Sequence, residues 1–369
     1  MTAAWQGRRV FLTGHTGFKG GWLAVWLREI GAYVTGYSLA PERESFYSAT
    51  GLRGSFPETI GDIRDLDALR RAMTAADPEV ILHLAAQPLV RASYLDPVGT
   101  FATNVMGTVH VLEAARRCSS LRAIVAITTD KVYRNEESRR GYSESDALGG
   151  SDPYSGSKSS AEHVCTVYRS SFFAEPRPPL LATARAGNVI GGGDWSADRL
   201  IPDIVRASGN GLATRIRSPQ SVRPWQHVLE PLAGYLRLAE RLLEGNRAFA
   251  SSWNFGPALD AVHTVAEVAD RFCAAWGPEA RWQSDGTGHP PETKVLVLDS
   301  AKAERDLGWR QVLSLGESVR LTADWYHAHG AARDMLSVTR EQIAGYRARV
   351  AGYDGAVRPN PPTVANSHG

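Results

Sequence analysis

The sequence predicts an α/β fold, a doubly wound parallel sheet followed by a smaller mixed α/β region, and three observations lead to this prediction. An apolar run, Val10–Leu12, leads directly into three glycines and then into a helical pattern. Buried strand patterns then alternate with amphipathic helices as far as residue 187, as a parallel sheet requires. From about Asn188, glycines, aromatics and arginines replace that alternation, so we expect the second region to begin there.

The first strand–helix unit carries Gly14, Gly17 and Gly20 with the spacing G-x-x-G-x-x-G. Glycine there allows a tight turn, close approach of the backbone to a diphosphate, and close packing of the helix on the strand. The free N–H groups and the positive dipole end of the helix also favour a diphosphate. Glycines occur in such turns without a ligand as well. The strand before and the amphipathic helix after this turn favour a Rossmann-type dinucleotide site.

The second strand, over residues 32–38, ends without the carboxylate that usually holds the adenosine ribose of NAD. Ser38 stands at that position, and the next acids are Glu42 and Glu44. This keeps NADP open beside NAD, because Arg43 could meet a 2′-phosphate. The plainer interpretation of Arg43 is a surface arginine.

A polar loop over 41–59 precedes a helix over 66–75, and Asp62 lies between them. Asp62 is placed where a carboxylate could accept a hydrogen bond from the adenine amino group; alternatively it caps a turn or helix. The next strand, 80–86, ends in small residues that let a flat ring approach. We expect His83 within it to be a hydrogen-bonded core histidine.

A long helix over 98–117 carries Asn104, and a strand over 121–129 then leads into Asp130 and Lys131. In doubly wound sheets, ligands bind beyond the carboxyl ends of the strands, where these last two residues lie. Asn104 either holds a water or a backbone carbonyl in the site, or it is simply a buried, hydrogen-bonded asparagine.

After a loop over 134–153, a helix over 154–172 carries Tyr154 and Lys158 on one face, four residues apart. A nearby ammonium favours the phenolate and lowers the pKa of the phenol. Tyr154 could then accept a proton from a sugar or alcohol hydroxyl group during its oxidation. This spacing alone usually marks two solvated helix residues. After a glycine-rich turn and the residues 128–130, it predicts a catalytic pair.

A strand over 180–186 completes a dinucleotide-binding domain over 1–187. A smaller substrate domain, partly interleaved with the first, is expected over 188–350. Residues 352–369 are rich in proline, asparagine and glycine and are expected to be disordered. The second region is predicted to contain helices at 200–209, 228–244, 264–276 and 300–307 and strands at 214–217 and 252–255.

The composition excludes several classes of protein. A net charge of +2 with 22% charged residues gives no sign of a nucleic-acid or anionic-membrane partner. No run of about 18 apolar residues predicts a membrane span, and residues 1–9 lack the apolar stretch of a secretory signal. The scattered Cys118, Cys165 and Cys273 fit neither a disulfide framework nor a metal site. They indicate a cytoplasmic protein without a metal.

The glycine turn, the segment 128–130 and the pair Tyr154 and Lys158 together resemble the extended short-chain dehydrogenase/reductase superfamily, over residues 8 to about 330. Within that superfamily the chain is most similar to the CDP-glucose 4,6-dehydratases. The segments that carry the narrower resemblance are Gly14-His-Thr-Gly-Phe-Lys-Gly-Gly-Trp22, Thr128-Thr-Asp-Lys-Val-Tyr133, Gly149-Gly-Ser-Asp-Pro-Tyr-Ser155, Gly192-Gly-Asp-Trp195, Asp198-Arg-Leu-Ile-Pro202, Arg223-Pro-Trp-Gln-His-Val-Leu-Glu230, Leu298-Asp-Ser-Ala-Lys302 and Leu307-Gly-Trp309.

The resemblance implies an internal redox cycle that converts CDP-D-glucose into its 4-keto-6-deoxy product and water, with tightly held NAD. Tyr154 would deprotonate the 4-hydroxyl with Thr129 bonded to the same oxygen, and Asp130 would protonate the departing 6-hydroxyl. Lys131 would stand where the thymidine-sugar dehydratases carry a glutamate base. A lysine base must be neutral, which Asp130 opposes and which Lys158 and burial favour, so the role of Lys131 stays open.

Beyond the catalytic candidates Thr129, Asp130, Lys131, Tyr154 and Lys158, two sets of contacts are expected. The cofactor set joins the glycine turn to the ends of the following strands and comprises Gly14, Thr16, Gly17, Phe18, Lys19, Gly20, Ser38, Asp62, Ile63, Leu84, Ala85, Ala86, Thr128, Tyr154 and Lys158. The substrate set comprises Gln87, Asn104, Asn188, Arg199, Arg217, Arg223 and His227. Arg223 is the best candidate to bind diphosphate oxygens, because arginine forks onto them. Arg217 could equally be an ordinary surface residue.

Two other functions stay open. A nucleotide-sugar 4-epimerase or reductase would need Tyr154 and Lys158 but would have no use for an acid–base pair at Asp130 and Lys131. A non-catalytic NAD(P)-sensing protein would often lack the tyrosine or the lysine. The helices at 100–117 and 154–172 resemble the pair that forms a four-helix dimer interface in the superfamily, so a homodimer or a dimer of dimers is expected.

Overall fold

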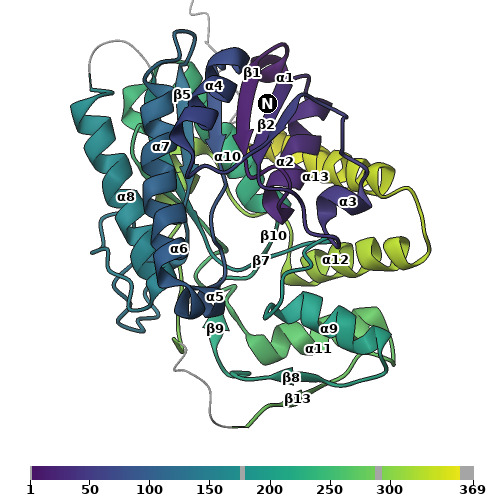
Figure 1. Ribbon diagram of the computed structural model, residues 1–369. Helices are drawn as coiled ribbons and strands as arrows, with labels where there is room; N and C mark the ends of the chain where they lie inside the picture. The colour runs from purple at the N-terminus through teal and green to yellow at the C-terminus, as the bar shows by residue number, and fades with distance from the viewer. Residues whose placement is uncertain (1, 175–178, 287–292, 358–369) are drawn as a thin grey trace, which may run out of the picture.

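The computed structural model describes residues 2–174, 179–286 and 293–357. At its centre lies a sheet of seven strands, each parallel to its neighbours (Figure 1). The order of the strands from β3 to β6 is that of a doubly wound sheet, so the predicted fold class is confirmed. Across the sheet lie β11 (Ser252–Phe255), β6 (Leu180–Ala186), β5 (Ala123–Ile127), β4 (Val80–His83), β1 (Arg9–Thr13), β2 (Tyr33–Ser38) and β3 (Glu58–Ile60).

Both faces of the sheet are buried, because successive strand residues point to opposite sides and helices cover each side. Phe11 and Ile81 belong to one apolar cluster, whereas Val10 and Leu12 belong to another. The first cluster is covered by α4 (Leu66–Ala76), α7 (Gly107–Ala115) and α8 (Pro153–Ser171). The second is covered chiefly by α2 (Phe18–Glu29), α10 (Leu229–Leu243), α12 (Leu315–Gly330) and α13 (Met335–Val357).

The remaining helices are shorter or lie in the second region. They are α1 (Thr2–Trp5), α3 (Phe46–Ala49), α5 (Val90–Leu95), α6 (Pro97–Phe101), α9 (Leu200–Gly209) and α11 (Val265–Trp276). Two 3-10 turns, Asp130–Val132 and Arg247–Phe249, and two π-helical turns, Ala102–Met106 and Ala303–Leu307, complete the helical elements of the described residues.

The second region contains three small strand pairs. They are β7 (Val189–Ile190) with β10 (Gln226–His227), β9 (Val222–Arg223) with β12 (His263–Thr264), and β8 (Thr214–Ile216) with β13 (Trp282–Ser284). Figure 1 shows α9, α11, β8 and β13 gathered at one end of the molecule. The chain passes between the two regions more than once, because β11 joins the main sheet beside β6 before α11 and β13 are formed, and α13 later packs on α2. The two regions are interleaved in the chain.

Periodicity places most elements correctly, and the differences have local causes. The predicted helix 98–117 is interrupted by the π-helical turn at Ala102–Met106, which bulges around Asn104. The strand expected over 80–86 ends at His83, because the following backbone turns to meet Thr13. The predicted loop 41–59 contains α3 and the start of β3.

The end of the chain differs most from expectation. No helix is predicted for the two long elements α12 and α13, although Ser314 and Glu317 form a capping box at the start of α12. Helix α13 continues through Val357, so residues 352–357 are helical rather than disordered. Residues 358–369 lie outside the described part of the chain.

All three cysteines carry free thiols. Among the helices that the structure describes, none combines the length and the apolar character that a membrane span needs. Within the same residues, no cluster of three or more His, Cys, Asp or Glu side chains is arranged to hold a metal ion.

Candidate active site

The carboxyl ends of the central strands bring the expected site residues to one edge of the sheet. Gly14 follows β1, Leu84 follows β4, and Thr128 follows β5 directly. Because neighbouring strands are parallel, these ends lie side by side. The site is therefore built on the rigid sheet and completed by the loops that leave it.

Two glycines of the turn, Gly14 and Gly20, lie so close to neighbouring backbone that no larger residue could replace them. Gly14 has φ +79°, and a Cβ atom on it would lie 2.8 Å from the backbone nitrogen of Ala85. A Cβ atom on Gly20 would lie 2.0 Å from the carbonyl oxygen of Gly14. Exposed Gly17 is the N-cap of α2, and no side chain caps this helix start. The N-terminal N–H groups of α2 beside Phe18 therefore fit a dinucleotide diphosphate.

At the end of β2, hydroxyl groups occupy the position where a carboxylate usually holds the adenosine ribose of NAD. Thr16 Oγ1 lies 2.7 Å from Ser38 Oγ, and it also donates to the carbonyl oxygen of Leu39. The nearby carboxylate of Glu58 is engaged elsewhere, with His15 Nε2 at 2.8 Å and Tyr47 Oη at 2.7 Å. Neutral hydroxyls thus line the expected ribose position.

Asp62 and Ile63 follow β3 at the same edge. The carboxylate of Asp62 accepts from the backbone N–H of Arg64 at 2.8 Å and from its guanidinium at 2.6 Å. These hydrogen bonds, led by that from the Arg64 side chain, lower the pKa of Asp62. Ile63 is buried against Gly107. The alternative of a turn aspartate fits Asp62, and its contact with adenine stays a prediction.

His83 is the hydrogen-bonded core histidine that the sequence predicts. Its Nδ1 lies 2.8 Å from Thr13 Oγ1 and its Nε2 lies 3.2 Å from Thr108 Oγ1. Burial, with a smaller contribution from the charge of Lys158, lowers its pKa to about 3, so the ring is neutral. Thr13 Oγ1 in turn accepts hydrogen bonds from the N–H groups of Leu84 and Ala85. These bonds fix the backbone that follows β4, where half-buried Ala86 also lies.

The side chain of Asn104 is buried and hydrogen-bonded to the backbone of Gln87. It is 2% exposed; its Oδ1 accepts from Gln87 N at 2.8 Å, and its Nδ2 donates to Gln87 O and to Ser157 Oγ. The Gln87 side chain donates to Thr100 Oγ1. Direct contact of Asn104 with a substrate is therefore not supported. The amide instead joins the end of β4 to the helix that carries Tyr154.

Tyr154 and Lys158 lie buried on the first turns of α8, which Asp152 caps by accepting from Ser155 N at 2.9 Å. Burial lowers the pKa of Lys158 to about 8, and its Nζ donates to Ile127 O at 3.1 Å. Burial also raises the pKa of Tyr154 to about 12, although a hydrogen bond with Thr129 opposes this. Burial is the largest influence on the pKa of this phenol and acts against the lowering expected from Lys158, which stays a prediction.

Thr129 connects the phenol to a buried acid. Its Oγ1 donates to Asp130 Oδ1 at 2.9 Å, and Asp130 is 2% exposed. Burial raises the pKa of Asp130 against the opposing charges of Lys131, Arg223 and Lys19. Its Oδ2 atom is buried without a hydrogen-bond partner among the described residues. A protonated carboxyl group that can donate a proton suits this position.

Lys19 and Lys131 approach the same acid from two segments. Lys19, from the glycine turn, is half-buried, and its pKa is lowered to about 8 by burial and by the charge of Arg199. Lys131 is half-buried in the 3-10 turn that follows Thr129. Two amines thus flank one carboxyl group at the edge of the sheet.

The arginines of the expected substrate set differ in their availability. Arg223 is buried, and its guanidinium donates to the carbonyl oxygens of Val222 at 2.9 Å and of Thr293 at 2.5 Å. These backbone acceptors use part of its five N–H donors, and the expected role of Arg223 as a phosphate ligand stays a prediction. Arg199 and Arg217 are partly exposed and pair with Asp194 at 3.2 Å and Asp198 at 3.3 Å respectively.

His227 and Asn188 lie on the paired strands β10 and β7 or beside them. His227 is completely buried; its ring meets Trp22 edge-on at 6.0 Å, and burial lowers its pKa to about 3. It is therefore a core residue, and the expected contact with a nucleotide is not supported. Asn188 is half-buried and its carbonyl oxygen accepts from Gln226 N, so its side-chain role stays a prediction.

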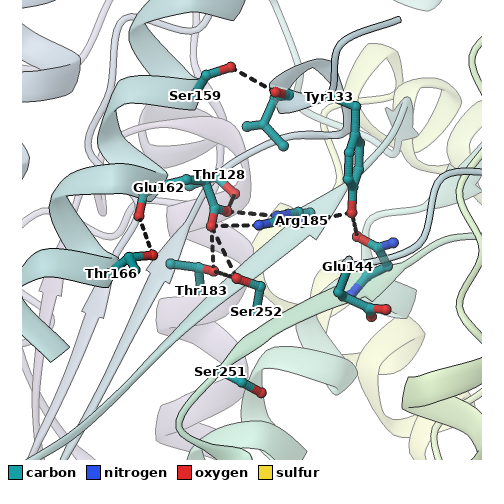
Figure 2. A network of polar contacts seen from close by, with 12 residues as sticks. Thr128, Tyr133, Glu144, Ser159, Glu162, Thr166, Thr183, Arg185, Ser251 and Ser252 are labelled. Carbon is teal, nitrogen blue, oxygen red and sulfur yellow. Dashed lines mark hydrogen bonds and ion pairs between the residues drawn. The ribbon is translucent and has the colours of Figure 1, made fainter. Parts of the chain in front are cut away.

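Sequence reasoning missed the buried pair Glu162 and Arg185, which lies behind the catalytic segment (Figure 2). One signal was present. The buried strand β6 alternates apolar residues with polar ones, Thr183 and Arg185, and such residues need partners inside the protein.

The comparison with known proteins agrees with this geometry. A sequence model of the family described as GDP-mannose 4,6 dehydratase matches residues 11–322. The chain belongs to this family. The match spans the glycine turn, the Thr129–Asp130 segment and the pair on α8, which places the candidate site within the family's shared region.

Relatives of this dehydratase family are similar to the chain over most of its length. A CDP-glucose 4,6-dehydratase from Salmonella typhimurium is 48% identical over 93% of this chain and 97% of the relative. A dTDP-glucose 4,6-dehydratase from Shigella flexneri is 26% identical over 73% of this chain and 78% of the relative. Among solved structures, a double mutant of dTDP-glucose 4,6-dehydratase from Streptomyces venezuelae with NAD bound has a TM-score of 0.72 and 25% identity, covering 89% of this chain and 99% of that one.

Proposed function

We propose that the protein is an NAD-dependent hydro-lyase that converts CDP-D-glucose into CDP-4-keto-6-deoxy-D-glucose and water. The observation that carries this proposal is the linked set Tyr154, Thr129 and Asp130 at the carboxyl edge of the sheet, beside the glycine turn. The CDP-glucose 4,6-dehydratase that is 48% identical supports the reaction and the choice of the cytidine nucleotide.

The cofactor part of the proposal rests on the fit of the glycine turn. The backbone of Gly14, Gly17 and Gly20 leaves room for a diphosphate, and the uncapped start of α2 supplies N–H donors. When bound, NAD⁺ supplies the oxidation at C4 and the later reduction at C6. NAD in the related Streptomyces venezuelae structure supports this cofactor.

Tyr154 is the base for the first proton. As the phenolate, it takes the proton of the 4-hydroxyl group, and a hydrogen bond with Thr129 favours that ionised form. The ammonium of Lys158 lies one helical turn away, held by the carbonyl of Ile127, and favours the phenolate when Tyr154 ionises.

The elimination uses the acid and the amine that follow Thr129. Lys131 in its neutral form removes the C5 proton, which the neighbouring 4-keto group has acidified. Asp130 gives its proton to the departing 6-hydroxyl group, so the C6–O bond breaks and water leaves. Burial raises the pKa of Asp130, which favours the protonated acid that this step needs.

The diphosphate of the substrate needs cations that are accessible. Arg199 and Arg217 are partly exposed beside the site, and each could exchange its carboxylate partner for phosphate oxygens. Half-buried Asn188 follows β6 at the carboxyl edge of the sheet and is proposed as a sugar contact.

The test is conversion of CDP-, dTDP-, UDP- and GDP-glucose in deuterium oxide. The expected product is the 4-keto-6-deoxy sugar from CDP-glucose, with one deuterium at C5 and the original C4 hydrogen at C6. A 4-epimerase would instead yield the C4 epimer without deuterium at C5. Net accumulation of reduced cofactor would indicate a dehydrogenase and contradict the proposal.

We also propose a homodimer. The exposed apolar side chains of α5, α6 and the following π-helical turn include Leu95, 89% exposed, and Val98, 79% exposed, and Val167 of α8 and Phe172, which follows α8, are exposed as well. Helices α5 and α6 both pack on α8, and exposed apolar side chains on such neighbouring helices favour a second copy as their cover. Sedimentation of the wild type and of Val98→Glu tests this, with a dimer expected only for the wild type.

A cytoplasmic location is proposed as well. The three cysteines of the chain are free thiols, and disulfides are rare in cytosolic proteins. Fractionation of the source cells, followed by detection of the protein, tests the location.

A further inference from the structure

Glu162 and Arg185 form an ion pair in the interior, directly behind the candidate catalytic segment (Figure 2). Their side chains are 1% and 3% exposed respectively. Two hydrogen bonds join them, from Arg185 Nε to Glu162 Oε1 at 2.9 Å and from Arg185 Nη2 to Glu162 Oε2 at 2.8 Å. Burial alone would raise the pKa of Glu162, but the hydrogen bond and charge of Arg185 lower it. The pair is therefore ionised.

Stability alone does not account for such a pair. Removing two charges from water is costly, and well-packed apolar residues often replace a buried ion pair without loss of stability. A buried ion pair with many hydrogen bonds can instead fix the arrangement of the segments that it joins. The further hydrogen bonds of Glu162 and Arg185 show which segments these are.

Glu162 binds the residue before the catalytic segment. Thr128 Oγ1 donates to Glu162 Oε1 at 2.6 Å, and Thr128 directly precedes Thr129. Thr183 Oγ1 donates to the other carboxylate oxygen at 2.8 Å, and Ser252 Oγ does so at 3.3 Å. The carboxylate thereby joins α8 to three neighbouring strands, β5, β6 and β11.

Arg185 binds Tyr133, two residues after the catalytic segment. Its Nη1 donates to Tyr133 Oη at 2.8 Å, and Tyr133 Oη donates to Asn254 Oδ1 at 2.7 Å. Thr128 and Tyr133 thus flank the stretch 129–131, and one ion pair holds both of them. Figure 2 shows Thr128 and Tyr133 reaching the pair from two directions.

We propose that the Glu162–Arg185 pair is a positioning device for the elimination step, a role that rests on the proposed function. It fixes the ends of the segment that carries Asp130 and Lys131 relative to α8. Glu162 lies one turn beyond Lys158 and two turns beyond Tyr154, so the oxidation and elimination groups share one anchor. The negative charge of Glu162 also favours the ammonium form of Lys158.

Single hydroxyl deletions test this role. Glu162→Gln would leave the Arg185 charge buried and unpaired and is expected to unfold the protein, so it is unsuitable. Tyr133→Phe removes one hydroxyl from the pair and changes no residue assigned to catalysis or binding. Thr166→Val is the matched control, because Thr166 Oγ1 donates only to the main-chain oxygen of Glu162, at 3.0 Å. Thr128→Val provides a second test from the other flank.

The first measurement is hydrogen exchange of the purified proteins, followed by mass spectrometry of peptides that cover 128–133. Tyr133→Phe and Thr128→Val are expected to exchange these amides about 10-fold faster than the wild type, and Thr166→Val at the wild-type rate. Equal protection in all four proteins would overturn the proposal, since the segment would then be fixed without the pair.

The second measurement separates the two chemical steps. Tyr133→Phe is expected to slow uptake of solvent deuterium at C5 about 10-fold, with KM for CDP-glucose and the rate of C4 oxidation within about 2-fold of the wild type. An equal loss in both steps would indicate a general structural role and overturn the proposal. Failure of the wild type to dehydrate CDP-glucose would instead refute the proposed function, and the hydrogen-exchange result would still report on the pair.

Discussion

Thr129 Oγ1 donates to Asp130 Oδ1 at 2.9 Å, while Asp130 Oδ2 is buried with no hydrogen-bond partner among the described residues. One oxygen of the acid is thereby oriented, and the other is left to exchange a proton. Thr129 is also hydrogen-bonded to the phenol of Tyr154. The two proposed proton-transfer groups are therefore linked through a single hydroxyl.

Replacement of this acid separates the two halves of the reaction. Asp130→Asn keeps the shape of the side chain but removes the donated proton, so we expect dehydration to fall about 10²- to 10⁴-fold. Oxidation at C4 does not use Asp130 and is expected to persist. Single-turnover absorbance of reduced cofactor and mass spectrometry of the sugar measure the two steps. Dehydration at the wild-type rate would remove Asp130 from the mechanism.

Lys131 is tested in the same way at the other end of the elimination. Lys131→Ala is expected to abolish exchange of the C5 hydrogen with solvent, because it removes the proposed base. C4 oxidation is expected to remain detectable. Lys19→Ala is the matched comparison, since Lys19 also approaches Asp130 but is proposed to act on the cofactor side. Unchanged dehydration in Lys131→Ala would assign the base to another residue.

The hydroxyl pair at the end of β2 predicts weak discrimination between NAD and NADP. Thr16 Oγ1 and Ser38 Oγ lie 2.7 Å apart and carry no charge that would repel a 2′-phosphate. Ser38→Asp is expected to weaken NADPH binding relative to NADH binding at least about 10-fold through like-charge repulsion. Ser38→Asn controls for size, and fluorescence titration measures both ligands. An unchanged ratio in Ser38→Asp would place the ribose away from this residue.

Local patterns account for what the sequence could predict. The spacing of Gly14, Gly17 and Gly20 and the four-residue step from Tyr154 to Lys158 lie within single elements, so periodicity reveals them. The alternation of strands and helices likewise predicts the parallel sheet. These features need no knowledge of distant partners.

Remote partners account for what it could not predict. Arg223 donates to the carbonyl oxygen of Thr293, 70 residues later, and His227 is enclosed against Trp22 of α2. Glu162 and Arg185 similarly meet only because α8 packs on β6. The residue type indicates which chemistry a side chain can perform, but segments far along the chain determine whether that side chain is buried.

Glu230 predicts how stability depends on pH. It is fully buried on α10. Its carboxylate accepts from Leu313 N at 2.7 Å and from Tyr346 Oη at 2.7 Å, which ties α13 and the segment before α12 to α10. Burial raises its pKa from the usual 4.5 to about 7. The folded protein therefore holds this proton at pH values where the unfolded chain has lost it. Its contribution to stability is present below pH 4.5 and is lost as the pH rises through 7.

Glu230→Gln removes the charge and keeps an oxygen to accept from the backbone N–H group of Leu313. The variant is expected to be more stable than the wild type at pH 8 by up to about 3 kcal/mol, the free energy that corresponds to the raised pKa. At pH 5, where Glu230 is protonated in the folded state, the advantage is expected to shrink to less than about 1 kcal/mol. Urea unfolding at both pH values measures this difference. An advantage of equal size at pH 5 and pH 8 would show that packing, and not the ionisation of Glu230, sets the stability at this site.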